Sequence, residues 1–352
     1  MIECNNDRIF KTAEIPCEEI SDPTMHAIMP LVSVTMITFN HAPYIAEAIE
    51  GVLNQKTKIP LELIIGEDCS TDNTREICKN YAKNNEGIIK LLPTESNLGM
   101  MPNFQRTLKA CTGKYIALCE GDDYWIDPNK LQKQVNYMEA HPECAMCFSA
   151  AEMIKGNGRK VGKFVRPNKG DRIFTVEDMI LGGGSLFHTG AVVLRKNIID
   201  NLPSWYFECP IGDYPLALIC AYHGTIAYMD EVMSVYRIAA AGSWTESMKS
   251  NKERWIEQII GIIEMLKCFN IYSGGKFEAA VNCQINNHKA YGVMLKGNRN
   301  CLKDPQNKKM FQHLSVFKRM TFIIGLYLPR TYRILFRIKY ALSKNWIDKF
   351  VD

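Results

Sequence analysis

Three carboxylates stand close together in one short stretch of the chain, at Glu120, Asp122 and Asp123. They follow the apolar run 114–118, which predicts a buried strand. Because adjacent acids repel one another and burial penalises each charge, a fold keeps such a cluster where something positive lies between the acids. Mg²⁺ and Mn²⁺ prefer oxygen ligands and take one or two protein carboxylates together with substrate phosphates. The cluster has two interpretations, a divalent-cation site and a solvated acidic turn that caps the next helix.

Short apolar runs alternate with longer amphipathic runs in the part of the chain that leads up to this cluster. The apolar runs predict strands and the amphipathic runs predict helices. We expect strands over 31–39, 61–66, 88–92 and 114–119, with helices over 40–55, 75–83 and 102–111 between them. Strands that alternate with helices are typical of a parallel, doubly wound α/β sheet.

Polar residues follow three of these strands, at Asn40, Asp68 and Asp122. In a doubly wound sheet, ligands bind outside the carboxyl ends of the strands. We therefore expect the three polar turns to meet at one edge of the sheet. This convergence favours the divalent-cation site over the capping turn.

The pattern beyond residue 125 is less regular. We expect helices over 130–140, 175–181 and 211–223, strands over 144–154, 190–194, 225–229 and 232–238, and a hairpin turn at 155–158. The small-residue loop 239–246 contains Trp244 and is a candidate lid over the sheet edge.

The composition is that of a globular protein, with 47% hydrophobic residues among 352. The net charge of +4 is too small to indicate a nucleic-acid partner. The 13 cysteines are odd in number and several lie inside apolar patterns, which indicates thiols in a reducing compartment. Residues 1–30 are acidic and lack the basic and apolar regions of a secretory signal, so we expect a cytoplasmic protein with a loose N-terminal leader.

The character of the chain changes after residue 248, where long helical patterns run over 252–269 and 276–295. The stretch 308–350 carries ten Lys and Arg residues against one Asp, interleaved with aliphatic and aromatic residues. Its apolar run 320–328 is far short of the ~20 residues that span a bilayer. A basic amphipathic helix of this kind can lie on an anionic membrane surface, and the alternative is a helix packed on the protein's own body. We favour the first, on the inner face of the cell membrane.

Three motifs follow one another in a specific order, joined by Asn97-x-Gly99 and Gly212-Asp213-Tyr214. They are Thr38-Phe39-Asn40-His41, the turn from Glu67 to Thr74, and Glu120-Gly121-Asp122-Asp123-Tyr124-Trp125. Together they resemble the family 2 glycosyltransferases over residues 31–244. The resemblance implies the A-type glycosyltransferase fold, a Rossmann-like, mostly parallel doubly wound α/β sheet, here with a C-terminal helical extension. We accordingly divide the chain into a leader (1–30), a catalytic domain (31–247) and a helical, basic region (248–352).

The resemblance also implies a nucleotide-diphosphate sugar as the donor, with a UDP-sugar favoured. Asp68 would accept hydrogen bonds from the base, and Asp72 in the same turn would also cap a helix. Asp123 would bind a Mn²⁺ or Mg²⁺ ion on the diphosphate, and Asp122 would face the ribose or that ion. The residues implied to contact the nucleotide sugar are Thr38, Phe39, Asn40, Asp68, Asp72, Asn97, Asp122, Arg237 and Trp244.

Asp213 matches the family's catalytic base, which takes the proton of an acceptor hydroxyl as the hydroxyl attacks the anomeric carbon. Its alternative role is a helix N-cap, and one side chain can do both. Many relatives carry a histidine after the last strand, whereas this chain has Ile238 and Ala239 there. Because the histidine of the relatives helps at the diphosphate, this departure makes Arg237 and Trp244 the candidates for that role. The alternative role of Arg237 is a structural ion pair, and that of Trp244 is loop packing.

We therefore predict an inverting, metal-dependent glycosyltransferase that acts on a saccharide or lipid-linked acceptor in surface polysaccharide or glycolipid synthesis. His188 and Thr189 are candidates for acceptor contact, although a lone histidine is more often structural. Two alternatives stay open, a non-catalytic nucleotide-sugar-binding module and a nucleotidyltransferase. The acids at Asp122, Asp123 and Asp213 argue against the first. The loop 40–43, which lacks Gly, Lys and Arg, argues against the second.

Overall fold

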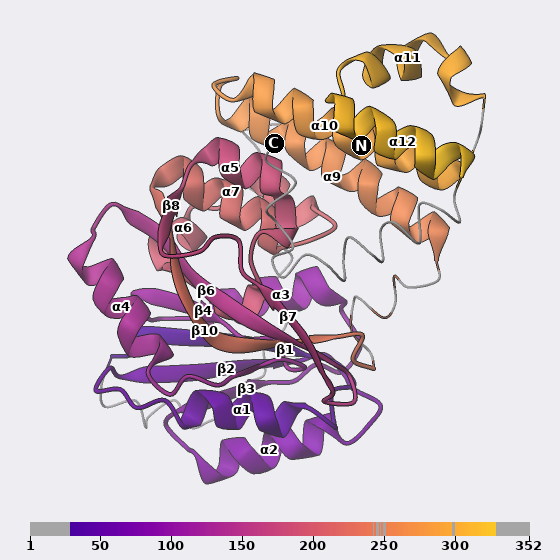
Figure 1. Ribbon diagram of the computed structural model, residues 1–352. Coiled ribbons are helices and arrows are strands. Elements are labelled where there is room, and N and C mark those ends of the chain that lie inside the picture. Colours follow the sequence, from indigo (N-terminus) through magenta and orange to yellow (C-terminus); the bar gives the residue numbers. More distant parts are fainter. Residues whose placement is uncertain are drawn as a thin grey trace.

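A ten-stranded sheet forms the centre of the protein, with helices on both faces and further C-terminal helices gathered on one side (Figure 1). The computed structural model describes residues 29–241, 243, 246, 248, 251–297 and 300–328. The predicted leader up to residue 28, Trp244 in the predicted lid, and the end of the basic region from residue 329 lie outside the described residues.

The first half of the sheet is parallel, as predicted. Its strands stand in the order β3-β2-β1-β4, and each neighbouring pair is parallel. They are β1 (Val32–Thr38), β2 (Leu61–Glu67), β3 (Ile89–Leu92) and β4 (Tyr115–Leu118). All residues of β1 are buried because helices cover both faces of the strand, which explains its continuous apolar run.

Helices on the two faces of the sheet enclose two hydrophobic cores. On one face lie α1 (Ile45–Leu53), α2 (Thr74–Asn84) and α4 (Lys130–Ala140). On the other face lie α3 (Met100–Lys109) and α7 (Asp213–His223). The carboxyl ends of the parallel strands are thereby left as the open edge where polar turns can gather.

The second half of the sheet is mixed. The added strands are β9 (Val192–Arg195), β6 (Cys144–Lys155), β10 (Thr225–Ile238), β5 (Tyr124–Trp125), β7 (Lys160–Val165) and β8 (Arg172–Phe174). Among them only β6 and β10 pair in parallel. The α/β class is confirmed, whereas the predicted parallel pairing holds for the first half of the sheet. Short connections such as the hairpin between β6 and β7 can join only antiparallel neighbours.

The two predicted strands 225–229 and 232–238 form a single strand, β10. Its register against β6 shifts between Met229 and Val232, where the sequence carries Asp230 and Glu231. A bulge of this kind interrupts the alternation of side chains without ending the strand. The prediction of two strands was wrong because the polar pair Asp230 and Glu231 lies in a bulge and not in a turn.

Shorter elements connect the second half of the sheet. They are α5 (Val176–Gly182), α6 (Lys196–Asp200) and the 3₁₀ turns η1 (Gly183–Ser185), η2 (Thr189–Ala191) and η3 (Ser204–Glu208). The predicted strand at 190–194 begins later, at Val192, because η2 occupies the preceding residues.

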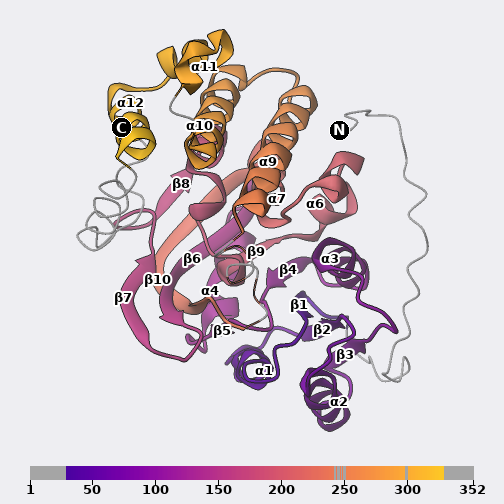
Figure 2. The ribbon, with the colours of Figure 1, turned by 90° about the vertical axis from the view of Figure 1, so that its right-hand side faces the viewer.

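The C-terminal helices are α9 (Lys252–Tyr272), α10 (Glu278–Lys296), α11 (Pro305–Gln312) and α12 (Val316–Tyr327), with the 3₁₀ turn η4 (Cys301–Lys303) before α11. Figure 1 places α9 and α10 beside α5 and α7, and Figure 2 shows α9 next to α7. Leu266, Phe269 and Val281 of these helices share the core of β4 and β6. The helices α9 and α10 therefore pack on the body of the protein, and the predicted domain boundary at 247/248 stays a prediction.

The helices α10, α11 and α12 enclose a third, smaller cluster that includes Ala290, Met310, Phe322 and Leu326. Among the described residues, no helix has the length and apolar character needed to cross a membrane.

Candidate active site

Among the described residues, three residues other than glycine adopt left-handed backbone conformations, and each follows a strand of the sheet. Asn40, Cys69 and Ala239 come after β1, β2 and β10 and have φ values of 55°, 57° and 55°. Side chains disfavour this region, and residues held in it cluster at functional sites. The backbone therefore marks the carboxyl edge of the sheet, which the sequence predicted as the site.

Asn40 and Asp72 hold the turns after β1 and β2 together. Asn40 Oδ1 accepts a hydrogen bond from the Thr71 N–H at 2.8 Å. Asp72 Oδ2 accepts one from the Ala42 N–H at 3.0 Å, and its Oδ1 accepts one from the Thr74 N–H at 2.9 Å. The N-cap of α2 is Asn73 and not Asp72, which the sequence had suggested, and Asp72 instead accepts the N–H of the first helical residue from one position earlier.

Asp68 is buried beside the turn that follows β3. Its two carboxylate oxygens accept hydrogen bonds from the Leu98 N–H at 2.8 Å and the Gly99 N–H at 2.9 Å. Asn97 Nδ2 donates to the Asp68 carbonyl at 3.0 Å. Burial raises the pKa of Asp68, whereas the two backbone donors favour its ionised form. The structure brings Asp68 and Asn97 together, and each carboxylate oxygen can accept a further hydrogen bond.

Gly121 allows the acidic turn to approach Thr38 and His41 closely. A Cβ atom at Gly121 would lie 2.7 Å from Thr38 Oγ1 and 3.0 Å from His41 Nδ1, so a larger residue would displace the two side chains. No described residue forms a hydrogen bond with either of these buried polar atoms. Because buried polar atoms are normally paired, the two atoms mark a place for a ligand or for water. Phe39 lies between the two residues and is half-buried.

Asp123 lies at the centre of the acidic cluster. Its Oδ1 accepts a hydrogen bond from the Arg237 N–H at 2.6 Å, and its Oδ2 lies 3.5 Å from His188 Nε2. Burial and the neighbouring Asp122 carboxylate raise the pKa of Asp123 well above its usual range. Burial lowers the pKa of His188 to about 3, so the imidazole is neutral and does not offset the negative charge of the cluster, which Arg237 offsets in part.

The other two acids of the cluster are also poorly compensated. Burial and the charges of Asp122 and Asp213 raise the pKa of Glu120 to about 8. Among the described residues, no side chain or backbone group donates a hydrogen bond to the Asp122 carboxylate. Within the part of the chain that the structure describes, no group of three or more His, Cys, Asp or Glu side chains lies in a position to hold a metal ion by itself. Two repelling carboxylates with free oxygens suit Mg²⁺ or Mn²⁺, which complete their coordination with water and phosphate oxygens.

Arg237 is a structural tie, which is the alternative that the sequence left open. Its Nε donates to the Asp122 carbonyl at 2.9 Å, and its Nη2 donates to Glu47 Oε2 at 2.6 Å. The guanidinium carbon lies 4.7 Å from the ring centroid of Tyr44 and 5.4 Å from that of Tyr124. These contacts use the Nε and Nη2 atoms of Arg237 to fix the acidic turn, and direct contact with a nucleotide sugar remains a prediction. Nothing in the sequence alone indicated Glu47 as its partner.

Asp213 is the first residue of α7, and Gly212 is the N-cap. Its Oδ2 accepts a hydrogen bond from Thr189 Oγ1 at 3.2 Å, and its Oδ1 accepts one from the Tyr214 N–H at 2.7 Å. Burial raises the pKa of Asp213, and these two donors oppose the rise. A general base is most effective when its pKa approaches the operating pH, so the burial suits this carboxylate to proton abstraction.

The predicted base and the predicted cation ligands share one electrostatic environment. Burial is the largest cause of the raised pKa of Tyr236. The charges of Asp123, Asp122 and Asp213 raise this pKa further. The Tyr236 ring stacks on the His188 ring with centroids 4.7 Å apart. His188 and Thr189, which the sequence suggested for acceptor contact, thus face the acids Asp123 and Asp213. The sequence showed only that the two residues precede a predicted strand, and it did not indicate these two acids as their partners.

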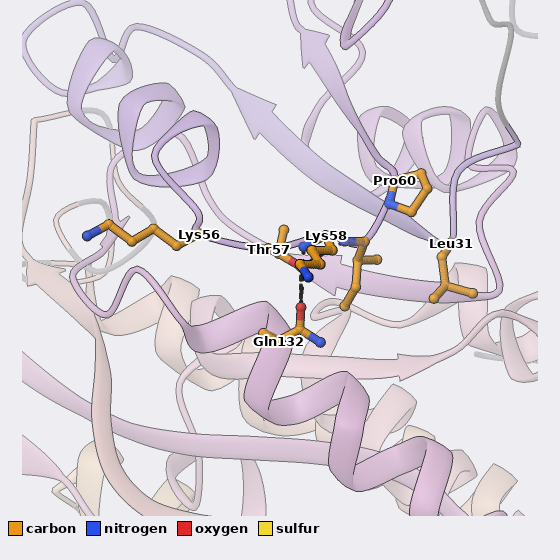
Figure 3. A pocket seen from close by; sticks show the side chains of 7 residues that line it. Leu31, Lys56, Thr57, Lys58, Pro60 and Gln132 are labelled. Atoms are coloured by element: carbon orange, nitrogen blue, oxygen red, sulfur yellow. Dashed lines mark hydrogen bonds between the residues drawn. The ribbon is translucent and has the colours of Figure 1, made fainter.

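A shallow hollow lies at the opposite edge of the sheet (Figure 3). Leu31 and Pro60, which immediately precede β1 and β2, line it, and Thr57 Oγ1 donates a hydrogen bond to Gln132 Oε1 there at 2.9 Å. None of the predicted site residues lines this hollow. It is therefore separate from the acidic edge.

A family model described as Glycosyl transferase family 2 matches residues 33–202. This span begins in β1 and ends beyond β9, and it contains the acidic cluster but not Asp213.

Two curated relatives extend the match. The Escherichia coli UDP-Glc:alpha-D-GlcNAc-diphosphoundecaprenol beta-1,3-glucosyltransferase WfgD is 30% identical over 229 residues, 64% of this chain and 84% of WfgD. The uncharacterized protein Rv1520 of Mycobacterium tuberculosis is 37% identical over 224 residues, 63% of this chain and 63% of Rv1520. The chain thus spans less than two thirds of the length of the mycobacterial relative.

Solved structures share the fold. S. aureus TarS 1-349 in complex with UDP-GlcNAc matches with a TM-score of 0.56 and 17% identity, over 91% of this chain and 89% of that one. The mannosyltransferase PcManGT from Pyrobaculum calidifontis, in complex with GDP-Man and Mn²⁺, matches with a TM-score of 0.50 and 15% identity, over 94% and 92% of the two chains. At such identities the likeness concerns the fold alone, and it confirms the predicted A-type architecture.

Proposed function

Because this chain belongs to glycosyl transferase family 2, we propose that it transfers a sugar from a nucleotide-diphosphate sugar to an acceptor hydroxyl, with inversion at the anomeric carbon. The observation that carries the proposal is the position of Asp213 in the electrostatic environment of Asp122 and Asp123, at the carboxyl edge of the sheet. A base and a pair of cation ligands at one edge are what a single displacement on a sugar diphosphate requires.

A UDP-sugar is the donor class that we infer. The relative WfgD is named for UDP-Glc, and the structural neighbour TarS was solved with UDP-GlcNAc. Asp68 and Asn97 would contact the base, and Thr38 and Asn40 would line the nucleotide pocket. The neighbour PcManGT was solved with GDP-Man, so a test of donors has to include guanine nucleotides.

Asp123 and Asp122 would hold a Mn²⁺ or Mg²⁺ ion. When bound, such an ion stabilises the charge that develops on the leaving diphosphate. The chain's contribution is to hold Asp123 through the Arg237 N–H at 2.6 Å and to leave the Asp122 carboxylate without a donor among the described residues.

Asp213 would act as the general base. The acceptor hydroxyl has a pKa far above 7, so its proton has to leave as its oxygen attacks the anomeric carbon. In this step the proton passes to Asp213, the new glycosidic bond forms, and the bond from the anomeric carbon to the diphosphate oxygen breaks on the opposite face of the sugar. Burial, which raises the pKa of Asp213, makes the carboxylate a stronger base than an exposed aspartate.

A panel of nucleoside diphosphates tests the donor class. UDP, GDP, dTDP and CDP are each added with and without Mn²⁺, and the melting temperature is measured. A ligand at ~100 times its Kd that binds only the folded state adds about 2.7 kcal/mol of stability, which is readily detected. We expect UDP with Mn²⁺ to raise the melting temperature most. Stabilisation by another nucleotide alone would reassign the donor, and no metal-dependent shift by any of the four would contradict the proposed site.

We infer a lipid-linked saccharide acceptor at a membrane surface. WfgD is named for a GlcNAc acceptor on diphosphoundecaprenol, which is a lipid carrier. Residues 301–352 contain eleven Lys and Arg against three Asp, although the whole chain carries a net charge of only +4. Cations concentrated in this way attract an anionic leaflet. Because nucleotide sugars are made in the cytoplasm, the leaflet we propose is the inner one.

The helix α12 supplies the apolar part of the proposed membrane contact. Val316, Met320 and Ile323 are 74%, 57% and 42% exposed, and their spacing places them along one stripe of the helix. The opposite stripe, with Phe322 and Leu326, is buried against α10 and α11. We propose that the exposed stripe inserts at the headgroup boundary while the surrounding lysines contact lipid phosphates.

Vesicle sedimentation tests this contact. We expect the full chain to sediment with phosphatidylglycerol vesicles and not with phosphatidylcholine vesicles, and to dissociate as salt is raised. The double variant Met320→Asp/Ile323→Asp should lose binding, because it places two charges in the apolar stripe. Ile173→Asp, at an exposed apolar position of β8, is the matched control and should bind like the wild type. Equal binding of all three proteins would exclude α12 as the contact.

A further inference from the structure

The turn formed by His188, Thr189 and Gly190 touches two functional carboxylates at once. Thr189 Oγ1 donates to Asp213 Oδ2 at 3.2 Å, and His188 Nε2 lies 3.5 Å from Asp123 Oδ2. We propose that this turn sets the position of the base Asp213 relative to the cation ligand Asp123. The proposal rests on the function proposed above, and it makes His188 and Thr189 positioning residues.

Buried hydrogen bonds hold the turn in place. Trp125 Nε1 donates to the Gly190 carbonyl at 2.7 Å, and Gln134 Nε2 donates to the Ala191 carbonyl at 2.9 Å. Trp125 is 4% exposed and Gln134 is fully buried. Trp125 also belongs to the acidic motif itself, so the motif anchors the turn that faces it. A turn that two buried side chains hold in this way keeps its position better than a surface loop does.

The His188 ring packs closely between Tyr236 and its own turn. It stacks on Tyr236, and a Cβ atom at Gly190 would lie 2.7 Å from its Nε2 atom, so the ring fills the space beside its own turn. No described residue forms a hydrogen bond with Nε2, which is buried. Its separation from Asp123 Oδ2 is at the outer limit of a hydrogen bond, and such contacts often tighten when the ligand binds.

The chemistry explains why one turn would hold both acids. The donor is fixed through its diphosphate at the Asp123 end, and the acceptor hydroxyl has to lie within hydrogen-bond reach of Asp213. A misplacement of about 1 Å between reacting groups can lower the rate ~10²-fold. A turn that contacts both carboxylates fixes their separation directly, without relying on the long path through the sheet.

Thr189 also influences the charge of the base. A hydroxyl that donates to a carboxylate favours the ionised form, so loss of the donor raises the pKa of Asp213. The titratable groups that sense the Asp213 charge are Glu120, Tyr206 and Tyr236. These groups are unchanged when Thr189 is replaced, so a difference from the wild type reports on the Thr189 contact.

The first arm of the test compares Thr189→Val with Thr189→Ser. Release of UDP from UDP-glucose in the presence of Mn²⁺ is measured as a function of pH. Valine has the shape of threonine without the donor, so we expect kcat about tenfold lower and the acidic limb about one pH unit higher, with KM unchanged. The limb moves upward because the carboxylate stays protonated to a higher pH. Serine keeps the hydroxyl and should restore both properties. Equal losses in the two variants, or no change in Thr189→Val, would overturn the assignment of Thr189.

The second arm measures Mn²⁺ affinity in the presence of UDP, by the electron paramagnetic resonance signal of free Mn²⁺. Phenylalanine keeps the stacked ring and loses the nitrogen, so His188→Phe should bind Mn²⁺ about tenfold more weakly, as typical for loss of a residue that orients a metal ligand. Thr189→Val should bind Mn²⁺ like the wild type. Wild-type affinity in His188→Phe would overturn the assignment of His188.

A control separates this proposal from the proposed function. If the wild type releases no UDP from UDP-glucose, the transfer proposal fails for that donor, but the contact can still be tested by unfolding. In a double-mutant cycle with Thr189→Val and Asp213→Asn, coupled side chains give non-additive changes in the free energy of unfolding. Additive changes would contradict the contact whether or not the protein is an enzyme.

Discussion

The Asp213→Asn variant is expected to lose turnover by about 10²- to 10⁴-fold, the usual contribution of a general base, while its affinity for UDP and Mn²⁺ stays that of the wild type. The asparagine Oδ1 can still accept the Tyr214 N–H, which lies 2.7 Å from the aspartate oxygen. The amide cannot accept the proton of the acceptor hydroxyl. Binding and chemistry are therefore separated by the exchange of one atom. Sugar release from UDP-glucose and the melting-temperature shift with UDP and Mn²⁺ measure the two properties.

Asp304→Asn is a matched control for this variant. Asp304 is also an aspartate at the start of a helix: it is the N-cap of α11, where its Oδ1 accepts the Gln306 N–H at 2.8 Å. We expect turnover within about twofold of the wild type, because a surface substitution of this kind has a small effect. Wild-type turnover in Asp213→Asn would instead favour a different base. Donor binding without transfer, with Asp213→Asn indistinguishable from the wild type, would favour a non-catalytic binding module. Release of pyrophosphate from a nucleoside triphosphate would favour a nucleotidyltransferase.

The sequence predicted the parallel part of the fold because each element there is specified locally. The run 31–39 is rich in apolar and β-branched residues, and the structure buries all of β1, Val32–Thr38. The polar residues after these strands could be placed at one edge, because parallel strands all end on the same side of a sheet. Asn40, Asp68 and Asp122 are found there. For the same reason the acidic cluster was recognisable before any contact was known.

The second half of the sheet was harder to predict because its pairing depends on partners far apart in sequence. β9 lies between β4 and β6 and is antiparallel to both, although nothing in its short apolar run indicates a direction. The Asp230–Glu231 bulge resembled a turn for a related reason: the strand continues because β6 supports both sides of the bulge.

The contacts that complete the site are also long-range. Arg237 meets Asp123 and Glu47 across 114 and 190 residues of the chain, and Thr189 meets Asp213 across 24. Single residues of these types are common at protein surfaces, so their composition and local pattern carry no signal. Trp125 belongs to the acidic motif of the sequence, but only the structure shows that its Nε1 donates a hydrogen bond to the Gly190 carbonyl and so anchors the positioning turn.

The Asp123→Asn variant should bind no Mn²⁺ in the site and should nevertheless melt at a higher temperature than the wild type when no ligand is present. Burial and the Asp122 carboxylate both disfavour the charge of Asp123, so removal of that charge relieves the folded state. The asparagine Oδ1 can keep the hydrogen bond from the Arg237 N–H. With UDP and Mn²⁺ at ~100 times the wild-type Kd, the variant should lose the added stability of about 2.7 kcal/mol. Donor turnover should fall with it, because the charge on the leaving diphosphate is no longer neutralised.

Asp200→Asn is the control for the two opposite effects expected of Asp123→Asn, a higher melting temperature without ligand and a lost stabilisation by UDP and Mn²⁺. Asp200 is half exposed and pairs with Lys196 at 2.5 Å on the surface, so its replacement should leave the response to UDP and Mn²⁺ intact and change stability little. If Asp123→Asn destabilises the unliganded protein and keeps the Mn²⁺ response, then Asp123 is a structural carboxylate and the cation is held elsewhere. If it stabilises the protein and abolishes the response, the wild-type site is strained by its own charges and the cation relieves that strain. In that case the unfavourable electrostatics at Asp123 are a consequence of binding a divalent ion with so few protein ligands.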